Sequence, residues 1–534
     1  MKKIWMTELS LFLSVLLLGC SSKQTIEIEK EVEQTSVYEK HLDLSIAYWD
    51  IDKALENREN DKVIMTIEDK FNVTIKPANI TWDDYYQKID LWANTGTLPD
   101  VFVGAFRTEA SFFQRAAEGL LHEIPQDLSK YPNLEKYMDS PAKETCQIDG
   151  KTYCIFRQTY SEQAETVKDR TILYRWDLAQ KAGITKEPET WDEFREMILA
   201  IMENDSDGTG IQGMTTKGYN MLIGPLFTYS MPLAATGGSG FYWIEQEEGY
   251  IPALFAGEEL GSDALPTWYM IREMYQEGTI EEDIFLTTTS QAEEKFLMGR
   301  NAAICIDGGI SSTKTYENIG RYWKEIHGRE FFEDVKALNI MQDVKGVPTY
   351  TVWDYAWSET YINAKVDEEK LDRILAIYDY LLSEEGILLS HFGVEGENYS
   401  LNQNGTIKLI SEEKPSDRYP SINLFSSLVC WNYGNEVAYK YPITVPEEYV
   451  LADARRVNMA RECRVPKYNY ECTKYFYQMG SDFTIDINNI FQRMMLDSKP
   501  VEEIWQEIID EYKQKGLEQV ITQVNEHVGG GIDL

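Results

Sequence analysis

The stretch that decides the fold is "LDLSIAYWD" at residues 42–50, followed by "DKVIMTIEDKF" at 61–71 and "NVTIKPANI" at 72–80. The first and third segments have the apolar pattern of strands, and the second places apolar residues at helical spacing. "WDDYYQKIDLWANTG" at 82–96 predicts another helix, and "DVFVGAF" at 100–106 another strand. This alternation indicates a parallel sheet with right-handed crossovers.

Aromatic and charged residues follow each of these predicted strands. Trp49 and Asp50 end the first strand, Trp82 follows the second, and Phe106 and Arg107 end the third. Ligands of open α/β sheets bind beyond the carboxyl ends of the strands. We therefore expect Trp49, Asp50, Trp82 and Arg107 to line a ligand crevice.

Further segments predict scaffold. "TILYRWDLAQKAGI" at 171–184 reads as a strand and a helix, and Thr190 with Glu193 forms a capping box for the helix that follows. A helix over 368–386 has one apolar stripe, made by Leu371, Ile374, Leu375, Tyr378, Leu381 and Leu382. Residues 501–528 are helical with a break at Gly516. No short repeat is present.

Composition excludes some partners. The net charge of -38 and the pI near 4.5 make nucleic acid an unfavourable partner, because like charges repel. A chain of 534 residues is too long for one core, and a large two-lobed body is the simplest arrangement. The 13 Trp and 33 Tyr supply many side chains that combine an apolar face with a hydrogen-bonding group.

The first residues predict export. Lys2 and Lys3 precede an apolar run from Leu9 to Leu18, which is too short to cross a bilayer of about 30 Å. The run ends in "LLGC", which resembles the lipobox of bacterial lipoproteins. That resemblance implies a signal peptide over 1–19, acylation of Cys20 and a flexible tether over 20–40, with the protein on the extracellular face of the cell membrane. The alternative is an ordinary signal peptide with a chance cysteine.

Six cysteines remain after Cys20. Cys146 and Cys154 flank the turn "CQIDGKTYC"; a two-residue loop would place them on different faces of a hairpin, and a three-residue loop would place them opposite each other. Cys463 and Cys472 form a second local pair. Both possible disulfides stay open at this point.

Five separated stretches resemble one family, the extracellular solute-binding proteins of family 1, and within it the LipO-like lipoproteins that serve carbohydrate ABC importers. The stretches are "QKIDLWANTGTLPDVFV" (87–103), "YRWDLAQKAGITKEPETWDEF" (174–194), "AEEKFLMGRNAAICIDGG" (292–309), "LLSEEGILLSHFGVEGENYSL" (381–401) and "KGLEQVITQVNEH" (515–527). The resemblance implies an α/β, two-lobed periplasmic-binding-protein-like fold (type II), each lobe a mostly parallel sheet flanked by helices. By analogy, lobe 1 comprises 41–157 plus 307–353 and lobe 2 comprises 158–306 plus 354–534.

The same resemblance implies a sugar or oligosaccharide between the lobes, delivery to membrane permease subunits, no cofactor and a monomer. A sugar site needs flat aromatic faces beside planar hydrogen-bonding groups. Besides the four crevice residues, the candidates are Arg157, Arg175, Trp176, Tyr242, Trp243, Trp353, Asp354, Tyr355, Trp357, Trp431 and Asn432. The competing interpretation of each aromatic is burial in a core, and Arg175 with Asp177 could be a structural ion pair.

Spacing adds one geometric expectation and two exclusions. If 353–357 is extended, Trp353, Tyr355 and Trp357 share a face and make a platform at a crossing between lobes.

"NDSDGTGIQG" matches a calcium loop only at Asp205 and Asp207, so a surface turn is favoured. The chain lacks the common hydrolase and nucleotide motifs and has five scattered His, which leaves a surface glycoside hydrolase with two carboxylates as the rival to a neutral-oligosaccharide binder.

Overall fold

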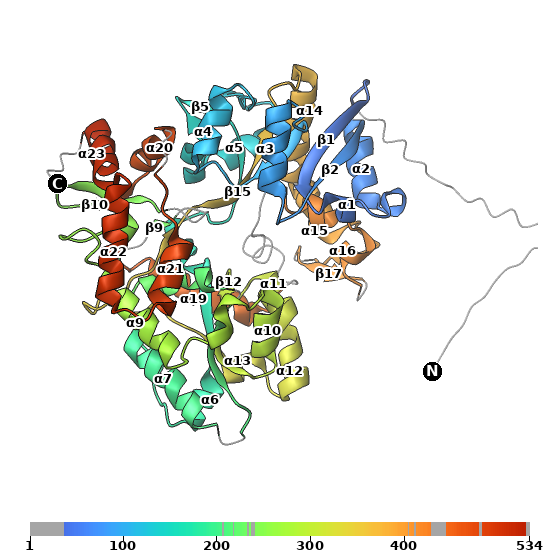
Figure 1. Cartoon of the computed structure of the whole chain (residues 1–534). Helices are drawn as coiled ribbons and strands as arrows, with labels where there is room; N and C mark the ends of the chain where they lie inside the picture. The colour runs from blue at the N-terminus through green and yellow to red at the C-terminus, as the bar shows by residue number, and fades with distance from the viewer. Residues whose placement is uncertain are drawn as a thin grey trace, which may run out of the picture.

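The computed structural model describes residues 37–205, 208–216, 218–231, 234–235, 241–403, 405–410, 413–428, 445–479 and 483–529. These residues form two α/β bodies, each with a sheet and a hydrophobic core of its own (Figure 1). We call them lobe 1 (37–158 and 356–428) and lobe 2 (163–353 and 445–529). The two-lobed α/β fold that the sequence predicted is confirmed.

Lobe 1 is built on a five-stranded sheet of order β2-β1-β3-β15-β6. Its strands are β1 (Leu42–Trp49), β2 (Val73–Ile80), β3 (Val101–Gly104), β6 (Ile155–Gln158) and β15 (Ala356–Ile362). β1 pairs in parallel with β2 and β3, whereas β15 runs antiparallel to both of its neighbours. The sheet is therefore mostly parallel, with one reversed strand.

Helices cover this sheet, and α2 and α3 among them lie where the sequence periodicity predicted; the helix expected over 368–386 ends at Leu381, and a second helix begins at Glu384. They are α1 (Ile51–Ala54), α2 (Lys62–Phe71), α3 (Tyr85–Thr95), α4 (Ala110–Ala117), α5 (Pro132–Met138), α14 (Glu368–Leu381), α15 (Glu384–Phe392), α16 (Pro415–Arg418) and α17 (Ile422–Phe425). The carboxylate of Asp61 accepts hydrogen bonds from the first amides of α2, and Asn72 ends that helix in a left-handed conformation. Short hairpins complete the lobe: β4 (Gln147–Ile148) with β5 (Lys151–Thr152), and β16 (Tyr399–Leu401) with β17 (Ile407–Leu409).

Lobe 2 contains a four-stranded sheet of order β13-β7-β12-β8. Its strands are β7 (Arg170–Arg175), β8 (Gln212–Thr216), β12 (Asn301–Asp307) and β13 (Val335–Ala337). β7 runs antiparallel to both β12 and β13, while β8 and β12 are parallel. The register pairs Arg170 with Asp307, so the carboxyl end of β7 lies at the opposite edge of the sheet from the carboxyl end of β12.

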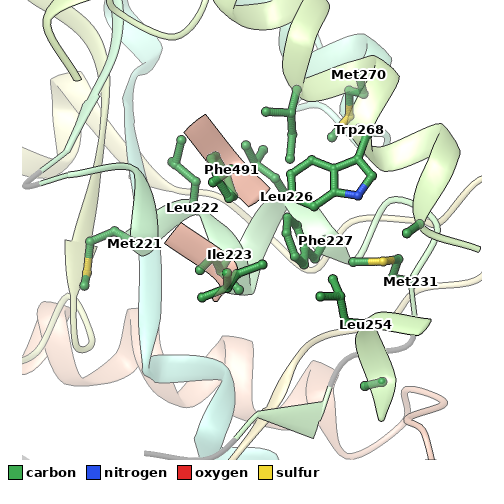
Figure 2. Close-up of a cluster of buried hydrophobic side chains, with 14 of the residues drawn as sticks. Met221, Leu222, Ile223, Leu226, Phe227, Met231, Leu254, Trp268, Met270 and Phe491 are labelled. Atoms are coloured by element: carbon green, nitrogen blue, oxygen red, sulfur yellow. The ribbon is translucent and has the colours of Figure 1, made fainter. Parts of the chain in front are cut away.

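The larger core of lobe 2 lies among its helices. Figure 2 shows α8 (Ile223–Phe227) packed between α9 (Ala264–Gln276) and α21 (Ile487–Leu496). The ring of Phe227 lies 5.0 Å from Trp268 and 5.9 Å from Phe491, and these rings are buried. Burying an aromatic side chain of this size contributes about 1.5–3 kcal/mol. This packing forms part of the lobe 2 core.

Lobe 2 contains further helices and strands besides the four-stranded sheet and the core around α8. The helices are α6 (Trp176–Lys181), α7 (Trp191–Glu203), α10 (Thr289–Leu297), α11 (Thr313–Thr315), α12 (Arg321–His327), α13 (Phe331–Asp334), α19 (Glu447–Ala460), α20 (Tyr470–Gln478), α22 (Val501–Gln514) and α23 (Leu517–Val528). The strands are β9 (Ala234–Ala235), β10 (Trp243–Gln246), β11 (Gly249–Pro252), β14 (Val352–Trp353) and β18 (Tyr468–Asn469). The Thr190–Glu193 capping box and the break at Gly516 are both present, as predicted.

The described chain passes from lobe 1 to lobe 2 at residues 158–163 and from lobe 2 to lobe 1 at residues 353–356. Leu428 lies in the lobe 1 core and Val445 in a lobe 2 core. The expected lobe boundaries were wrong for two segments. Residues 307–353 belong to lobe 2, because β13 pairs with β7 and Trp323 lies in a lobe 2 core. Residues 356–428 belong to lobe 1, because β15 pairs with β3 and carries the striped helix α14 into the lobe 1 core.

Across the part of the chain that the structure describes, no helix combines the length and the apolar character that crossing a bilayer requires.

Candidate functional site

The carboxyl edge of the lobe 1 sheet gathers the first set of predicted residues. Because β1, β2 and β3 are parallel, Trp49, Trp82 and Arg107 all emerge at this edge. Asp50 follows Trp49 in a left-handed conformation, with φ of 53°, and its carboxylate Oδ1 lies 3.1 Å from Nζ of Lys53. The parallel topology therefore places these residues at one edge of the lobe 1 sheet.

Three indole rings form a layered cluster at this edge. The ring centroids of Trp49 and Trp82 are 4.3 Å apart with an interplanar angle of 7°, and the ring of Trp357 lies 5.8 Å from each of them, within 13° of parallel. Trp49 is buried, Trp357 is half-buried and Trp82 is 47% exposed. Trp82 is therefore partly exposed while its ring stacks on the buried ring of Trp49.

A buried cation lies beside these rings. The guanidinium carbon of Arg157 is 5.3 Å from the Trp49 ring centroid, 5.6 Å from that of Tyr48 and 6.0 Å from that of Trp357. The side chain is fully buried in β6. Cation–π contacts of this kind stabilise by about 0.5–2 kcal/mol, more when desolvated. Arg157 thus supports the indole cluster from within lobe 1.

Arg107 is the centre of a buried ion cluster that ties the second crossing segment to lobe 1. Its Nη2 lies 2.6 Å from Oδ2 of Asp354, its Nη1 donates to Oγ1 of Thr145 over 2.8 Å, and its Nε is 3.4 Å from Oε2 of Glu359. Burial opposes the charge of Arg107, but the two carboxylates outweigh burial and raise its pKa. The hydroxyl of Tyr361 and two backbone amides also donate to Glu359. The guanidinium of Arg107 is therefore engaged by Asp354, Thr145 and Glu359, and it holds the second crossing segment against lobe 1.

Aromatic residues of lobe 2 cover this ion cluster. The buried ring of Tyr242 stacks on Tyr468 at 4.6 Å, and burial followed by the carboxylate of Asp354 raises the pKa of Tyr242. The hydroxyl of Tyr470 donates to the carbonyl oxygen of Thr145 in lobe 1 over 3.3 Å. Tyr242 therefore lies at the junction of the lobes, although its side chain is inaccessible in this arrangement.

The expected common face of Trp353, Tyr355 and Trp357 does not form. The register of β15 against β6 shifts between Ala356 and Glu359, and the chain bends between β14 and β15. Trp353 stays with lobe 2, where the guanidinium carbon of Arg170 lies 4.8 Å from its ring centroid, whereas Trp357 joins the indole cluster of lobe 1. The prediction of an interlobe crossing here was correct, but the chain runs from lobe 2 to lobe 1.

Backbone hydrogen bonds hold the first two crossing segments together. The carbonyl oxygen of Tyr355 accepts from the amides of Thr159 and Tyr160, both over 2.9 Å, and the amide of Trp357 donates to Oγ1 of Thr159. A pocket of lobe 2 lies beside this crossing and is lined by Trp353, Arg170, Gly224, Tyr350 and Arg456, among others. The second crossing segment therefore runs from Trp353, which lines this pocket, to Trp357, which belongs to the indole cluster.

Three predicted site residues are corrected, because their side chains pack inside lobe 2. Arg175 makes a bidentate ion pair with Asp177, with both N···O distances 2.8 Å, which is the structural alternative that the sequence left open. Trp176 is buried on α6, and Trp243 is 1% exposed. The cause for Arg175 and Trp176 is the reversed direction of β7, which carries them to the sheet edge away from lobe 1.

Sequence reasoning missed a carboxyl group at the same lobe 1 edge. Glu109 precedes α4, and its Oε1 accepts a hydrogen bond from the hydroxyl of Tyr86 over 3.1 Å. Burial raises the pKa of Glu109 to about 7. The position of Glu109 just after β3 could have marked it as a candidate site residue. The burial that raises its pKa, however, arises from tertiary packing.

A second missed feature is the turn after β12 in lobe 2. The carboxylate of Asp453, on α19, accepts from the amides of Ile310 and Ser311 and from the hydroxyl of Ser311 over 2.7–3.3 Å. A Cβ added to Gly309 would lie 2.2 Å from the Asp453 carboxylate. The small residues of this turn are therefore required by the close approach of α19.

Several predictions lie wholly or partly outside the described residues. Cys20, Trp431 and Asn432 belong to this group, as does Asp207 of the possible calcium loop. The carboxylate of Asp205 accepts from the amides of Thr209, Gly210 and Ile211, which is the arrangement of a surface turn. Among the residues that the structure describes, no cluster of His, Cys, Asp and Glu is arranged to hold a metal ion.

The cysteines of the described chain are free thiols. β4 and β5 pair Gln147 with Thr152 around a two-residue loop, which is the register that the sequence linked to different faces for Cys146 and Cys154. Both thiols are buried nonetheless, and the Cys154 thiol is hydrogen-bonded to Cys146; burial, followed by this contact, raises its pKa. Cys463 and Cys472 are also unlinked.

A family model described as bacterial extracellular solute-binding protein matches residues 62–390, more than half of the chain. The chain belongs to this family.

Two relatives from Bacillus subtilis (strain 168) extend the comparison. Lipoprotein LipO is 24% identical over 338 residues, which cover 61% of this chain and 62% of LipO. The polygalacturonan/rhamnogalacturonan-binding protein YtcQ is 24% identical over 384 residues, which cover 69% of each chain. The matched region thus spans somewhat less than two thirds of LipO.

Solved structures share the fold. The alginate-binding protein AlgQ2, solved without calcium ion, superimposes with a TM-score of 0.70 at 18% identity, covering 92% of this chain and 99% of AlgQ2. The substrate-binding protein FusA of an S. pneumoniae ABC transporter, in complex with kestose, has a TM-score of 0.65 at 15% identity, covering 91% and 98%. At these identities the likeness establishes the fold.

Proposed function

We propose that this chain captures a sugar or an oligosaccharide between its two lobes and delivers it to the permease subunits of an ABC importer without chemical change. The observation that carries the proposal is the indole cluster of Trp49, Trp82 and Trp357 at the carboxyl edge of the lobe 1 sheet. A half-exposed ring backed by a parallel ring is suited to stack on the C–H face of a sugar, and the crossing segments beside it allow the lobes to close.

The relatives support a carbohydrate ligand. YtcQ and AlgQ2 are named for polysaccharide ligands, and FusA was solved with kestose. For this chain we favour a neutral oligosaccharide. Of the described cations at the lobe 1 edge, Arg107 pairs with Asp354 and Glu359, and Lys53 pairs with Asp50. Arg157 is fully buried against the rings of Tyr48, Trp49 and Trp357. A uronate ligand would need a cation that could face it.

A binding screen tests this proposal. Purified protein is titrated with neutral oligosaccharides and with uronate oligosaccharides while Trp fluorescence is followed. The mass of the recovered ligand is then measured by mass spectrometry. We expect a fluorescence change and small-angle scattering evidence of closure with a neutral sugar that is recovered intact. Shortened sugars would favour the surface glycoside hydrolase, and no response to any sugar would reject the proposal.

We further propose that the protein is a lipid-anchored monomer on the extracellular face of the cell membrane. The "LLGC" sequence at residues 17–20 and the lipoprotein name of LipO support acylation at Cys20. Cys20→Ala should release the protein into the medium or leave it uncleaved, and light scattering of the soluble form should give the mass of one chain. Membrane retention of a normally cleaved Cys20→Ala variant would contradict the anchor.

A further inference from the structure

The two sides of the molecule differ in how the lobes touch. On one side lie the first two crossing segments and α20, a helix anchored in lobe 2 by the buried Cys472. From α20, the hydroxyl of Tyr470 donates to Thr145 of lobe 1, and Tyr477 packs against the lobe 1 core. These contacts hold the lobes together along one side and make it the natural axis of any opening.

Across the molecule from α20, α16 of lobe 1 faces α11 and α12 of lobe 2 (Figure 1). Here Nζ of Lys414 pairs with Oε2 of Glu317, which lies on the π-helical turn Tyr316–Gly320 between α11 and α12. Within the described ranges, this is the ion pair that joins the lobes away from the crossing segments. Such a pair can exist only when the lobes are close together on this side.

Both partners are positioned by packed elements. Lys414 immediately precedes α16, and the buried Tyr419 that ends this helix belongs to the lobe 1 core. The turn that carries Glu317 includes the buried Ile319 and presses on α19 so closely that a Cβ on Gly320 would lie 2.3 Å from the Tyr449 hydroxyl. The separation of the two charges therefore follows the separation of the lobes.

We propose that Lys414 and Glu317 form a latch that stabilises the closed arrangement and slows release of the bound sugar. This inference rests on the proposed function. The Lys414 side chain is 46% exposed and that of Glu317 is 27% exposed, with Arg321 at 3.9 Å from Glu317. Exposed ion pairs contribute modestly, so loss of the latch should speed release about two- to fivefold.

The test is a double-mutant cycle with charge reversal. Lys414→Gln and Glu317→Gln should each speed dissociation of the sugar in stopped-flow Trp fluorescence, and the two changes together should add little. The reversed pair Lys414→Glu with Glu317→Lys should restore slow release. High salt should speed release by the parent and leave Lys414→Gln nearly unchanged, because salt screens the pair. Lys324→Gln, which breaks an ion pair with Glu330 inside lobe 2, is the matched control.

A second measurement separates this proposal from the proposed function. Fluorescent labels on the two lobes report their separation without any sugar, and Lys414→Gln should shift the parent distribution towards greater separation. If no sugar binds to the parent, the proposed function fails and the label experiment still decides the latch. Release rates and lobe separations that are the same in Lys414→Gln, in the Lys324→Gln control and in the parent would overturn the latch.

Discussion

The half-buried carboxyl group of Glu109 gives the sharpest quantitative prediction. Burial dominates its environment and raises its pKa from the ordinary value of 4.5 to about 7; the Tyr86 hydroxyl and Arg115 lower it, and the Glu359 carboxylate raises it further. The folded state therefore retains a proton that the unfolded state loses. Stability associated with this proton is present below pH 4.5 and is lost as the pH rises through 7.

The magnitude follows from the same numbers. A rise of about 2.5 in pKa corresponds to about 3 kcal/mol, since one pKa unit is worth about 1.4 kcal/mol. Glu109→Gln keeps an acceptor for the Tyr86 hydroxyl and removes the ionisation. We expect this variant to be about 2–4 kcal/mol more stable than the parent at pH 8 and to differ little from it at pH 4.5.

Urea unfolding of the parent and the variant across pH 4.5–8 measures the difference. Glu118→Gln, at the exposed end of the same helix α4, is the matched control for losing one negative charge in a chain of net charge -38. Its stability should follow the parent profile within about 0.5 kcal/mol. Parallel pH profiles for Glu109→Gln and the parent would refute the assignment of a raised pKa to this carboxyl.

Three further predictions follow from the packing. Trp82→Ala should weaken sugar binding by about 1–3 kcal/mol, by analogy with aromatic stacking on bases, whereas the core variant Trp243→Ala should cost about 3–5 kcal/mol of stability; calorimetry of both separates the roles. Arg107→Met should destabilise the fold by about 3–5 kcal/mol in thermal unfolding, because it leaves the buried Asp354 and Glu359 without their cation. Gly309→Ala should lower the melting temperature, because its Cβ meets the Asp453 carboxylate; an unchanged melting curve would contradict the close approach.

Local pattern was sufficient for much of lobe 1. The alternation from residue 42 to 106 predicted β1, α2, β2, α3 and β3 in order, because amphipathic spacing and capping residues act over a few neighbours. It also placed Trp49, Trp82 and Arg107 at one sheet edge, since parallel strands share their carboxyl ends. The motifs of the later segments identified the family that the comparison confirms.

Strand direction and lobe membership were decided by pairing between distant segments. Nothing within residues 170–175 records that β7 runs antiparallel to β12, yet this reversal removed Arg175 and Trp176 from the site. Likewise, the apolar stripe of α14 would allow this helix to pack in either lobe. The pairing of β15 with β3 assigned it to lobe 1.

The chemistry of the site depended on the tertiary structure for the same reason. Arg107 stands at the predicted edge, but its burial against Asp354 and Glu359, about 250 residues later in the chain, made it an anchor. The position of Glu109 just after β3 was a local signal, but its partial burial, like the proximity of Lys414 to Glu317, is a property of surfaces brought together by folding. The sequence by itself determined which elements form and which residues end the first strands; only the tertiary structure decided which of those side chains are buried, paired or exposed.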